Sequence, residues 1–299
     1  MRQITANGIT LNYEDRGPAD APVMLLVNGF GSTMMSWPAD FMEGLKARGY
    51  RVIRYDNRDA GKSEKLTGLP SVIQVIAALK EGRQPETPYT LSDMAADGIG
   101  LMDALDIAKA HVVGVSMGGM IVQNMAIHHA DRLHSVTSVM STTGNYDLPP
   151  ASEAAMAALT AVPPSEEREA VIAHRMAGRR IFESPAYPKT DEELYRLVAA
   201  EYDHMYYPEG SIRQYAAIVA DGSRVERLKK VCVPFLVIHG KADPLLRPEG
   251  GMDTAKAVPG ARLELIDGMG HDLPTELCAR MVQLISDHAD AAGARAAAE

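Results

Sequence analysis

Residues 111–120 read His-Val-Val-Gly-Val-Ser-Met-Gly-Gly-Met, a buried-strand pattern that stops at Ser116 and passes directly into a helix-like stretch. Gly114, Ser116 and Gly118 form a G-x-S-x-G pattern. A serine on so tight a strand-to-helix turn takes a strained backbone conformation, which pushes its hydroxyl out of the fold. The two glycines remove Cβ atoms that would collide where the strand and the helix approach each other. The stretch predicts an exposed nucleophilic serine, with a glycine-rich turn and an idle serine as the alternative.

Strand-like and helix-like stretches alternate around this turn, which predicts βαβ units and a mostly parallel sheet. The chain opens with a hairpin pattern over 4–15, with Asn7-Gly8 at its turn. Further strands are expected at 23–27, 51–55, 110–115, 133–140, 233–239 and 262–266. Helices are expected at 36–48 with Ser36 as the N-cap, at 90–105 with Thr90 and Asp93 at its start, and at 275–288. The tail 289–299 is expected to be frayed helix or disordered.

The alternation stops at about residue 145, and the sequence is then helical until about residue 230. We therefore expect an α/β core domain made of 1–144 and 231–299, with a helical cap formed by 145–230. An insertion that follows the carboxyl end of a strand lies over the ligand crevice of an open α/β sheet, so the cap is interpreted as a lid.

The composition excludes several classes of partner. The chain has 299 residues, 46% of them hydrophobic, and a net charge of −9 without a long basic run, which argues against nucleic acid and anionic membranes as partners. No signal peptide or membrane-spanning stretch is expected. Cys232 and Cys278 are expected to be buried free thiols, which suits the cytoplasm.

A nucleophilic serine needs a base and a group that orients that base. Among nine histidines, His271 follows the last expected strand in a glycine-rich loop, Gly268-Met-Gly-His271, where it can reach the carboxyl edge of the sheet. Asp243 follows the strand before that one and gives the chain order Ser, acid, His. Asp267 and Asp272 are rival acids, but both lie close to His271 in sequence.

The oxyanion that forms on attack needs backbone N–H donors. We expect one from Met117, the residue after the nucleophile, and one from Phe30 in the loop Asn28-Gly-Phe-Gly31. Gly61-Lys62-Ser63 resembles the end of a phosphate-binding loop, but Asp56 occupies the position of the required glycine, so nucleotide binding is rejected. No His, Cys, Asp or Glu cluster has metal-ligand spacing, and no cofactor is expected.

Taken together, these motifs resemble the α/β-hydrolase superfamily over nearly the whole chain. Within it, the Arg54–Ser63 stretch and the Ser116-Met-Gly-Gly turn are similar to the serine esterases related to aclacinomycin methylesterase and to the cofactor-free haloperoxidase/esterase group. The chain departs from the family pattern at Asn28, where histidine is usual, and at Asp59, where glycine is usual. The resemblance implies an α/β-hydrolase fold and a Ser-His-Asp triad.

The residues next to the expected sheet edge predict an apolar pocket, because methionine is flexible and polarizable. Its candidate residues are Met34, Met35, Met140 and Met269 near this edge and Tyr206 in the lid. Met140 can equally be an ordinary core residue, and Tyr206 can simply pack the lid against the body. The leading hypothesis is hydrolysis of a small to medium apolar carboxylic ester through an acyl-serine intermediate. A lactone, an amide, a carbon–carbon bond or perhydrolysis remain alternatives with the same triad, and a ligand receptor with this fold is a further one.

Overall fold

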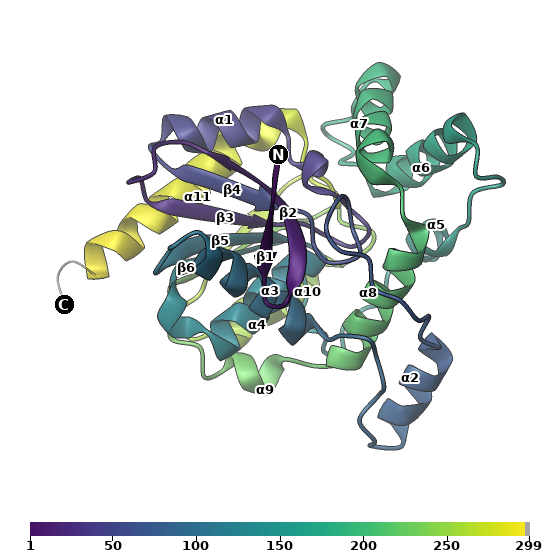
Figure 1. Ribbon diagram of the computed structural model, residues 1–299, viewed down its shortest axis with the longest axis horizontal. Helices are drawn as coiled ribbons and strands as arrows, with labels where there is room; N and C mark the ends of the chain where they lie inside the picture. Colours follow the sequence, from purple (N-terminus) through teal and green to yellow (C-terminus); the bar gives the residue numbers. More distant parts are fainter. Residues whose placement is uncertain (297–299) are drawn as a thin grey trace.

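An eight-stranded sheet forms the centre of the computed structural model, which describes residues 1–296 (Figure 1). The strand order is β1-β2-β4-β3-β5-β6-β7-β8. The β1–β2 and β2–β4 pairs are antiparallel, and every later pair is parallel, as the strand and helix alternation predicts. The strands are β1 (Arg2–Ala6), β2 (Ile9–Arg16), β3 (Val23–Val27), β4 (Arg51–Tyr55), β5 (Ala110–Val115), β6 (Leu133–Val139), β7 (Phe235–Gly240) and β8 (Arg262–Ile266).

The first turn is the predicted hairpin. Ala6 pairs with Ile9, and Asn7 and Gly8 have φ values of 50° and 77°. Positive φ at both central residues matches the twist of the flanking strands, and Asn-Gly is the dipeptide that adopts it most readily. The hairpin adds two antiparallel strands to one edge of the parallel sheet.

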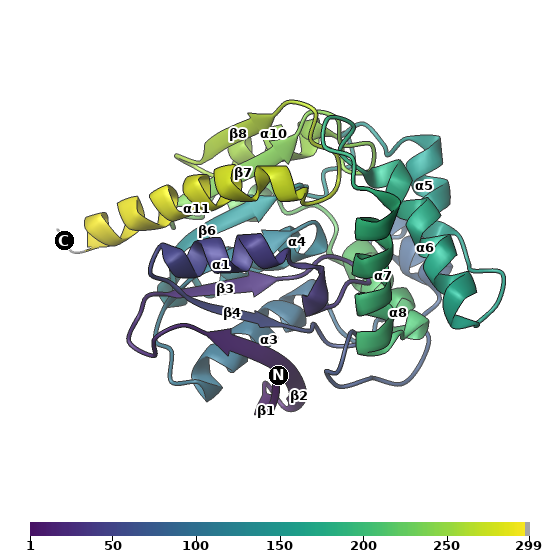
Figure 2. The same cartoon turned by 90° about the horizontal axis from the view of Figure 1, so that it is seen from above.

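Helices cover both faces of the sheet (Figure 2). α1 (Ala39–Ala47) and α11 (Thr275–Ala296) pack on one face, and α3 (Leu91–Ala104), α4 (Met117–His128) and α10 (Pro248–Ala257) pack on the other. β3 is buried along its whole length, with alternate residues in the two core clusters. A strand covered on both faces reads as a continuous apolar run, which is the pattern that its sequence shows.

The long segment between β6 and β7 is helical, and Figure 2 shows most of it gathered at one end of the sheet. It contains α5 (Glu153–Thr160), α6 (Arg168–Phe182), α7 (Asp191–Met205), α8 (Pro208–Asp221) and the short α9 (Val225–Leu228). Its two ends are neighbours, because the Arg224 N–H donates to the Thr143 carbonyl at 2.8 Å. The chain therefore leaves the core and returns to it at one place.

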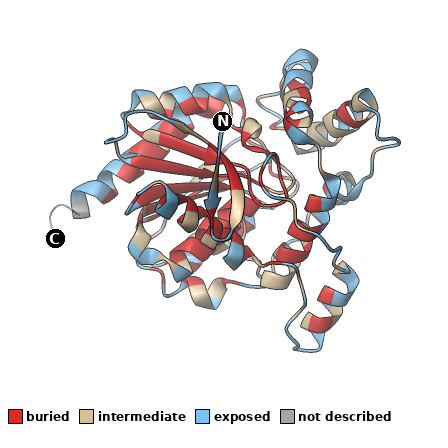
Figure 3. Ribbon diagram, viewed as in Figure 1, coloured by how far each residue is buried: buried red, intermediate tan, exposed pale blue. Residues whose placement is uncertain are grey.

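Burial follows this division of the chain (Figure 3). The five strands β3 to β7 are almost entirely buried, and the strands at the two edges of the sheet are partly exposed. In contrast, α6 and α7 expose much of their surface and form a small apolar cluster of their own around Ile172 and Val198. A further exposed helix, α2 (Val72–Lys80), packs against α8 and has no counterpart among the predicted elements.

Three expectations need correction or extension. Ser36 is not the N-cap of α1, which begins after Pro38; Thr33 instead caps the short 3₁₀ turn Met34–Ser36. Cys232 is exposed, and only Cys278 is buried, because Cys232 lies in the loop before β7 rather than in it. α11 continues to Ala296, well beyond residue 288, because Ala289 and Ala292 still pack into the core; the last predicted tail residues, 297–299, lie outside the described part. Within residues 1–296, no helix is long and apolar enough to cross a membrane.

Candidate active site

Ser116 lies on a strained turn between β5 and α4. Its φ and ψ are 56° and −119°, a backbone conformation that residues other than glycine rarely adopt. A Cβ at Gly114 would lie 2.1 Å from the Gly118 carbonyl oxygen, and one at Gly118 would lie 2.1 Å from the Val27 oxygen. Both contacts are far too short for any side chain, so this turn requires glycine at both positions. The G-x-S-x-G pattern is thus explained by the close approach of β3, β5 and α4.

The structure brings the three predicted side chains together from distant parts of the chain. The Ser116 hydroxyl lies 3.0 Å from Nε2 of His271, and the other ring nitrogen, Nδ1, lies 2.7 Å from the Asp243 carboxylate. Asp243 follows β7 and His271 follows β8, so both lie at the carboxyl edge where Ser116 ends β5. The His271 backbone N–H donates to the Phe182 carbonyl at 2.7 Å, which fixes its loop to the end of α6.

Asp243 is held as a buried carboxylate. Its Oδ1 accepts the backbone N–H groups of Leu245 and Leu246, each at 2.9 Å. Burial opposes ionisation, but the charge of His271 and hydrogen bonds from His239 and His271 outweigh it, so the pKa of Asp243 lies well below its usual range. A carboxylate that stays ionised selects the His271 tautomer with the proton on Nδ1 and leaves Nε2 free to accept the serine proton.

The two rival acids lie elsewhere. Asp267 pairs with Lys241 at 2.8 Å on the surface, and Asp272 is bound by Ser184 and Lys189. Neither therefore takes the position beside Nδ1 of His271.

The loop after β3 lies directly beside the serine. A Cβ at Gly29 would lie 3.2 Å from the Ser116 Cβ and 3.8 Å from its Oγ. Asn28, which stands where histidine is usual, anchors this loop: its amide donates to the Tyr55 carbonyl at 2.8 Å, and its own carbonyl accepts from Asn57 at 3.0 Å. Within residues 1–296, the N–H groups of Phe30 and Met117 donate to no other group of the chain. Backbone N–H groups that are not otherwise paired are the kind of donor that an oxyanion requires.

Comparison with known proteins agrees with this geometry. A family profile described as "alpha/beta hydrolase fold" matches residues 22–174, about half of the chain. The chain belongs to the α/β-hydrolase family. Among curated relatives, this hydrolase is 30% identical to rhodomycin D methylesterase of Streptomyces peucetius, over 97% of its own length and 98% of the relative. It is 26% identical to 3-oxoadipate enol-lactonase 2 of Acinetobacter baylyi, over 88% of its own length and 87% of the relative.

Solved structures support the same fold. The enol-lactonase from Burkholderia xenovorans LB400 superposes with a TM-score of 0.73 and 25% identity, covering 96% of this hydrolase and 99% of that chain. A meta-cleavage product hydrolase from Pseudomonas fluorescens IP01 gives a TM-score of 0.77 at 22% identity, covering 98% of each chain. The second similarity concerns the fold alone.

Of the predicted pocket residues of the hydrolase, Tyr206 lines a cavity in the structure. The cavity has a volume of about 30 Å³, and Gly31 and Thr33 also line it. Met35 is half-buried, whereas Met34 and Met269 have no exposed surface, and Met140 packs with Met269 in the core. Met34, Met140 and Met269 therefore lie in the core, and their role as pocket residues stays a prediction.

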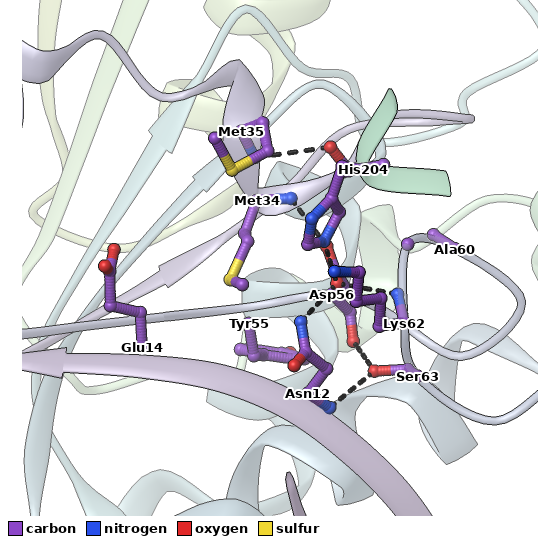
Figure 4. Close-up of polar contacts among 12 residues, drawn as sticks. Asn12, Glu14, Met34, Met35, Tyr55, Asp56, Ala60, Lys62, Ser63 and His204 are labelled. Atoms are coloured by element: carbon purple, nitrogen blue, oxygen red, sulfur yellow. Dashed lines mark hydrogen bonds and ion pairs between the residues drawn. The ribbon is translucent and has the colours of Figure 1, made fainter. Parts of the chain in front are cut away.

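A buried polar cluster beside the site was not anticipated (Figure 4). Asp56, at the end of β4, accepts hydrogen bonds from the Asn12 amide at 2.8 Å, from the Met34 N–H at 2.7 Å and from the Lys62 N–H at 2.9 Å. Its fourth partner is His204 of α7, at 2.7 Å. In the sequence, Asp56 belongs to the Arg54–Ser63 stretch and is the residue that excludes a phosphate-binding loop, and nothing in the sequence points to a partner 148 residues away.

The structure also explains why aspartate can stand at position 59, where the family usually has glycine. Asp59 has a φ of 64°, a conformation that glycine adopts without strain and aspartate adopts less readily. Its carboxylate accepts from Arg213 of α8 at 2.8 and 3.0 Å, and both side chains are buried. The aspartate therefore keeps the turn that glycine would make and adds an ion pair to the inserted helices.

We expect Asp56→Asn to destabilise the hydrolase by about 3 kcal/mol at pH 7, because His204 loses a buried charged partner. Burial opposes ionisation of Asp56, but the hydrogen bond and charge of His204 and the two N–H groups hold its pKa below the ordinary 3.8. A lowered folded-state pKa gives stability that is complete above the unfolded-state pKa and is lost as the pH falls through the folded-state value. Urea denaturation at about pH 5 should show the difference from wild type, which shrinks as the pH falls below about 4.

The exposed Glu43→Gln, which also loses an ion pair, is the control and should leave the midpoint unchanged. A difference between wild type and Asp56→Asn that grows as the pH falls would contradict the assignment.

Proposed function

We propose that this hydrolase cleaves a carboxylic ester of a small to medium apolar substrate through an acyl-serine intermediate. The observation that carries the proposal is the continuous hydrogen-bonded chain from Ser116 through His271 to Asp243, with distances of 3.0 and 2.7 Å. The similarity to rhodomycin D methylesterases over nearly the whole chain supports an ester as the bond that is cleaved.

The proposed reaction begins when Oγ of Ser116 attacks the ester carbonyl carbon and its proton passes to Nε2 of His271. The carbon–oxygen bond to the alcohol then breaks, and His271 returns the proton to the departing alkoxide. Water next attacks the acyl-serine, gives a proton to His271, and the acid leaves as Ser116 recovers its hydrogen. Asp243 stabilises the imidazolium formed in each half of the cycle, and the net reaction consumes one water per ester.

Two backbone donors would stabilise the oxyanion of each tetrahedral intermediate. Phe30 and Met117 are the residues that we assign to this role, because Met117 follows Ser116, Phe30 follows Gly29 beside it, and their N–H groups are unpaired within residues 1–296. Donors that are already oriented contribute more than water does, since they need no reorganisation as the charge develops.

We further propose that the helical segment 145–230 is a cap over the substrate site. The cavity lined by Tyr206 lies between α7, α8 and the loop after β3, and the His271 loop is bonded to the end of α6. The free thiols of Cys232 and Cys278 suit a reducing compartment such as the cytoplasm, where we place the enzyme.

A lactone is the second candidate substrate. It is favoured by the similarity to 3-oxoadipate enol-lactonases in both sequence and structure. A lactone is an internal ester, so the same serine attack opens its ring, and the alcohol stays attached to the acyl group. The two substrates differ in the shape of the pocket rather than in the catalytic groups.

A panel of p-nitrophenyl esters of increasing chain length, beside lactones and a p-nitroanilide, tests the proposal. We expect turnover of the short to medium esters, with an initial burst of p-nitrophenol that approaches one equivalent per enzyme if deacylation is slow. Turnover of a lactone with no activity on any linear ester would favour the second candidate. Hydrolysis of the anilide alone, or no turnover of any substrate, would contradict both.

A further inference from the structure

Helix α8 contacts the loop after β3 at three points. Oε1 of Gln214 accepts the Gly31 N–H at 2.9 Å. The Ser211 hydroxyl lies 3.1 Å from the place where a Gly31 Cβ would be. The Tyr215 ring packs edge-on against the Phe30 ring, with their centroids 6.1 Å apart. A helix from the inserted segment thus packs directly against the loop that carries the Phe30 N–H.

The Gln214 side chain has a fixed orientation. It is fully buried, its Oε1 accepts from Gly31, and its Nε2 donates to the Arg58 carbonyl at 3.0 Å. Only one rotamer of the terminal amide satisfies both partners, because a backbone N–H can only donate and a carbonyl oxygen can only accept. The amide therefore links the loop after β3 to the loop after β4.

The helix that carries Gln214 is itself anchored to the core. Arg213, the preceding residue, forms the buried ion pair with Asp59. A Cβ at Gly210 would lie 2.0 Å from the Asp59 carbonyl oxygen, so the backbones of α8 and this loop are in direct contact. Arg58 is held in turn by Asp97 through two bonds of 2.6 Å. The helix segment that carries Gln214 and the loop that it contacts are therefore both held by buried ion pairs.

The loop held by Gln214 is a tight turn over Gly29–Ser32. The Ser32 N–H donates to the Gly29 carbonyl at 3.4 Å, and Gly31 has a φ of 60°. Positive φ at the third residue is what a type II turn requires. Rotation of the Phe30–Gly31 peptide would change the turn, and the bond from Gly31 to Gln214 opposes that rotation.

We propose that Gln214 is a positioning residue for the oxyanion site. It occupies the Gly31 N–H and fixes the turn in which the Phe30 N–H remains available to the oxygen of the tetrahedral intermediate. The inference rests on the proposed ester hydrolysis and adds to it a residue from the inserted helices, 98 positions after the serine along the chain.

The test is Gln214→Met, which keeps the length of the side chain and removes both hydrogen bonds. With the p-nitrophenyl ester that wild type cleaves fastest, we expect kcat to fall about tenfold or more and KM to change less than about threefold, because the lost interaction belongs to the transition state. The inhibition constant of a trifluoromethyl ketone analogue, whose adduct with the serine carries an oxyanion, should rise by the factor by which kcat/KM falls. Gln214→Glu keeps the acceptor for Gly31 and should lose less activity than Gln214→Met.

Gln123→Met is the matched control. Gln123 is also fully buried and also makes two side-chain hydrogen bonds, to Arg224 and Ser138, but neither reaches the loop after β3. Folded Gln123→Met should retain the wild-type kcat and inhibition constant. The proposal is overturned if folded Gln214→Met keeps the wild-type kcat and inhibition constant. If Gln214→Met does not fold, the same result with Gln214→Glu overturns it. It is also overturned if folded Gln123→Met loses as much kcat as Gln214→Met. Failure of the proposed function would instead appear as wild-type protein without ester turnover.

Discussion

Ser116→Ala is expected to lose about 10³-fold or more of its kcat on p-nitrophenyl esters while remaining folded. The serine, histidine and aspartate act as a unit, so removal of the nucleophile leaves only what substrate binding and the oxyanion donors supply. Among the described residues, the hydroxyl makes one side-chain hydrogen bond, to His271, and its loss should not lower stability. Initial rates together with a thermal melting curve measure both effects.

The chain supplies a matched control in a second serine–histidine contact. The Ser135 hydroxyl lies 2.8 Å from Nδ1 of His111, and both residues lie near the start of their strands, at the opposite edge of the sheet. Burial and the neighbouring histidines His134 and His288 lower the pKa of His111 to about 4. Ser135→Ala should keep full activity. Equal rates for Ser116→Ala and wild type would refute the acyl-serine mechanism.

Asp243→Asn is expected to lower kcat by about 10³- to 10⁴-fold, nearly as much as the loss of the serine. An asparagine amide at this position donates to Nδ1 of His271, so the ring proton moves to Nε2, which can then no longer accept from Ser116. The His271 imidazolium also loses its counter-charge. The measurement is kcat over a range of pH, because a change of tautomer is not corrected by adding base.

Asp267→Asn is the matched control for this variant. Asp267 lies closer to His271 in sequence but pairs with Lys241 at the surface, so its change should leave kcat unaltered. If Asp267→Asn and Asp243→Asn lost similar activity, the orienting acid would have been assigned wrongly.

Most of the sheet could be predicted because its signals are local. The Asn7-Gly8 turn, the apolar run of β3 and the capping box of Thr90 and Asp93 each lie within a few residues, and the structure confirms all three. The predicted nucleophile, base and acid also lie within hydrogen-bonding distance of one another, because parallel strands bring the residues that follow them to the same edge of the sheet. Their catalytic roles stay a prediction.

Contacts between the insertion and the core could not be predicted. Asp56 with His204, Asp59 with Arg213 and Gly31 with Gln214 join residues more than a hundred positions apart, and polar side chains on an amphipathic helix read as solvent-facing. The expected methionine pocket rests on position along the chain alone. Proximity in sequence to a strand end does not determine which way a flexible side chain turns, and Met34 and Met269 turn inward.

The chain leaves the core and returns to it at a single point, at Thr143 and Arg224, so other helices could be joined there without moving β6 or β7. Such helices would have to replace the contacts of His204 with Asp56 and of Arg213 with Asp59. Under the role that we propose for Gln214, any replacement would also have to present an acceptor to the Gly31 N–H.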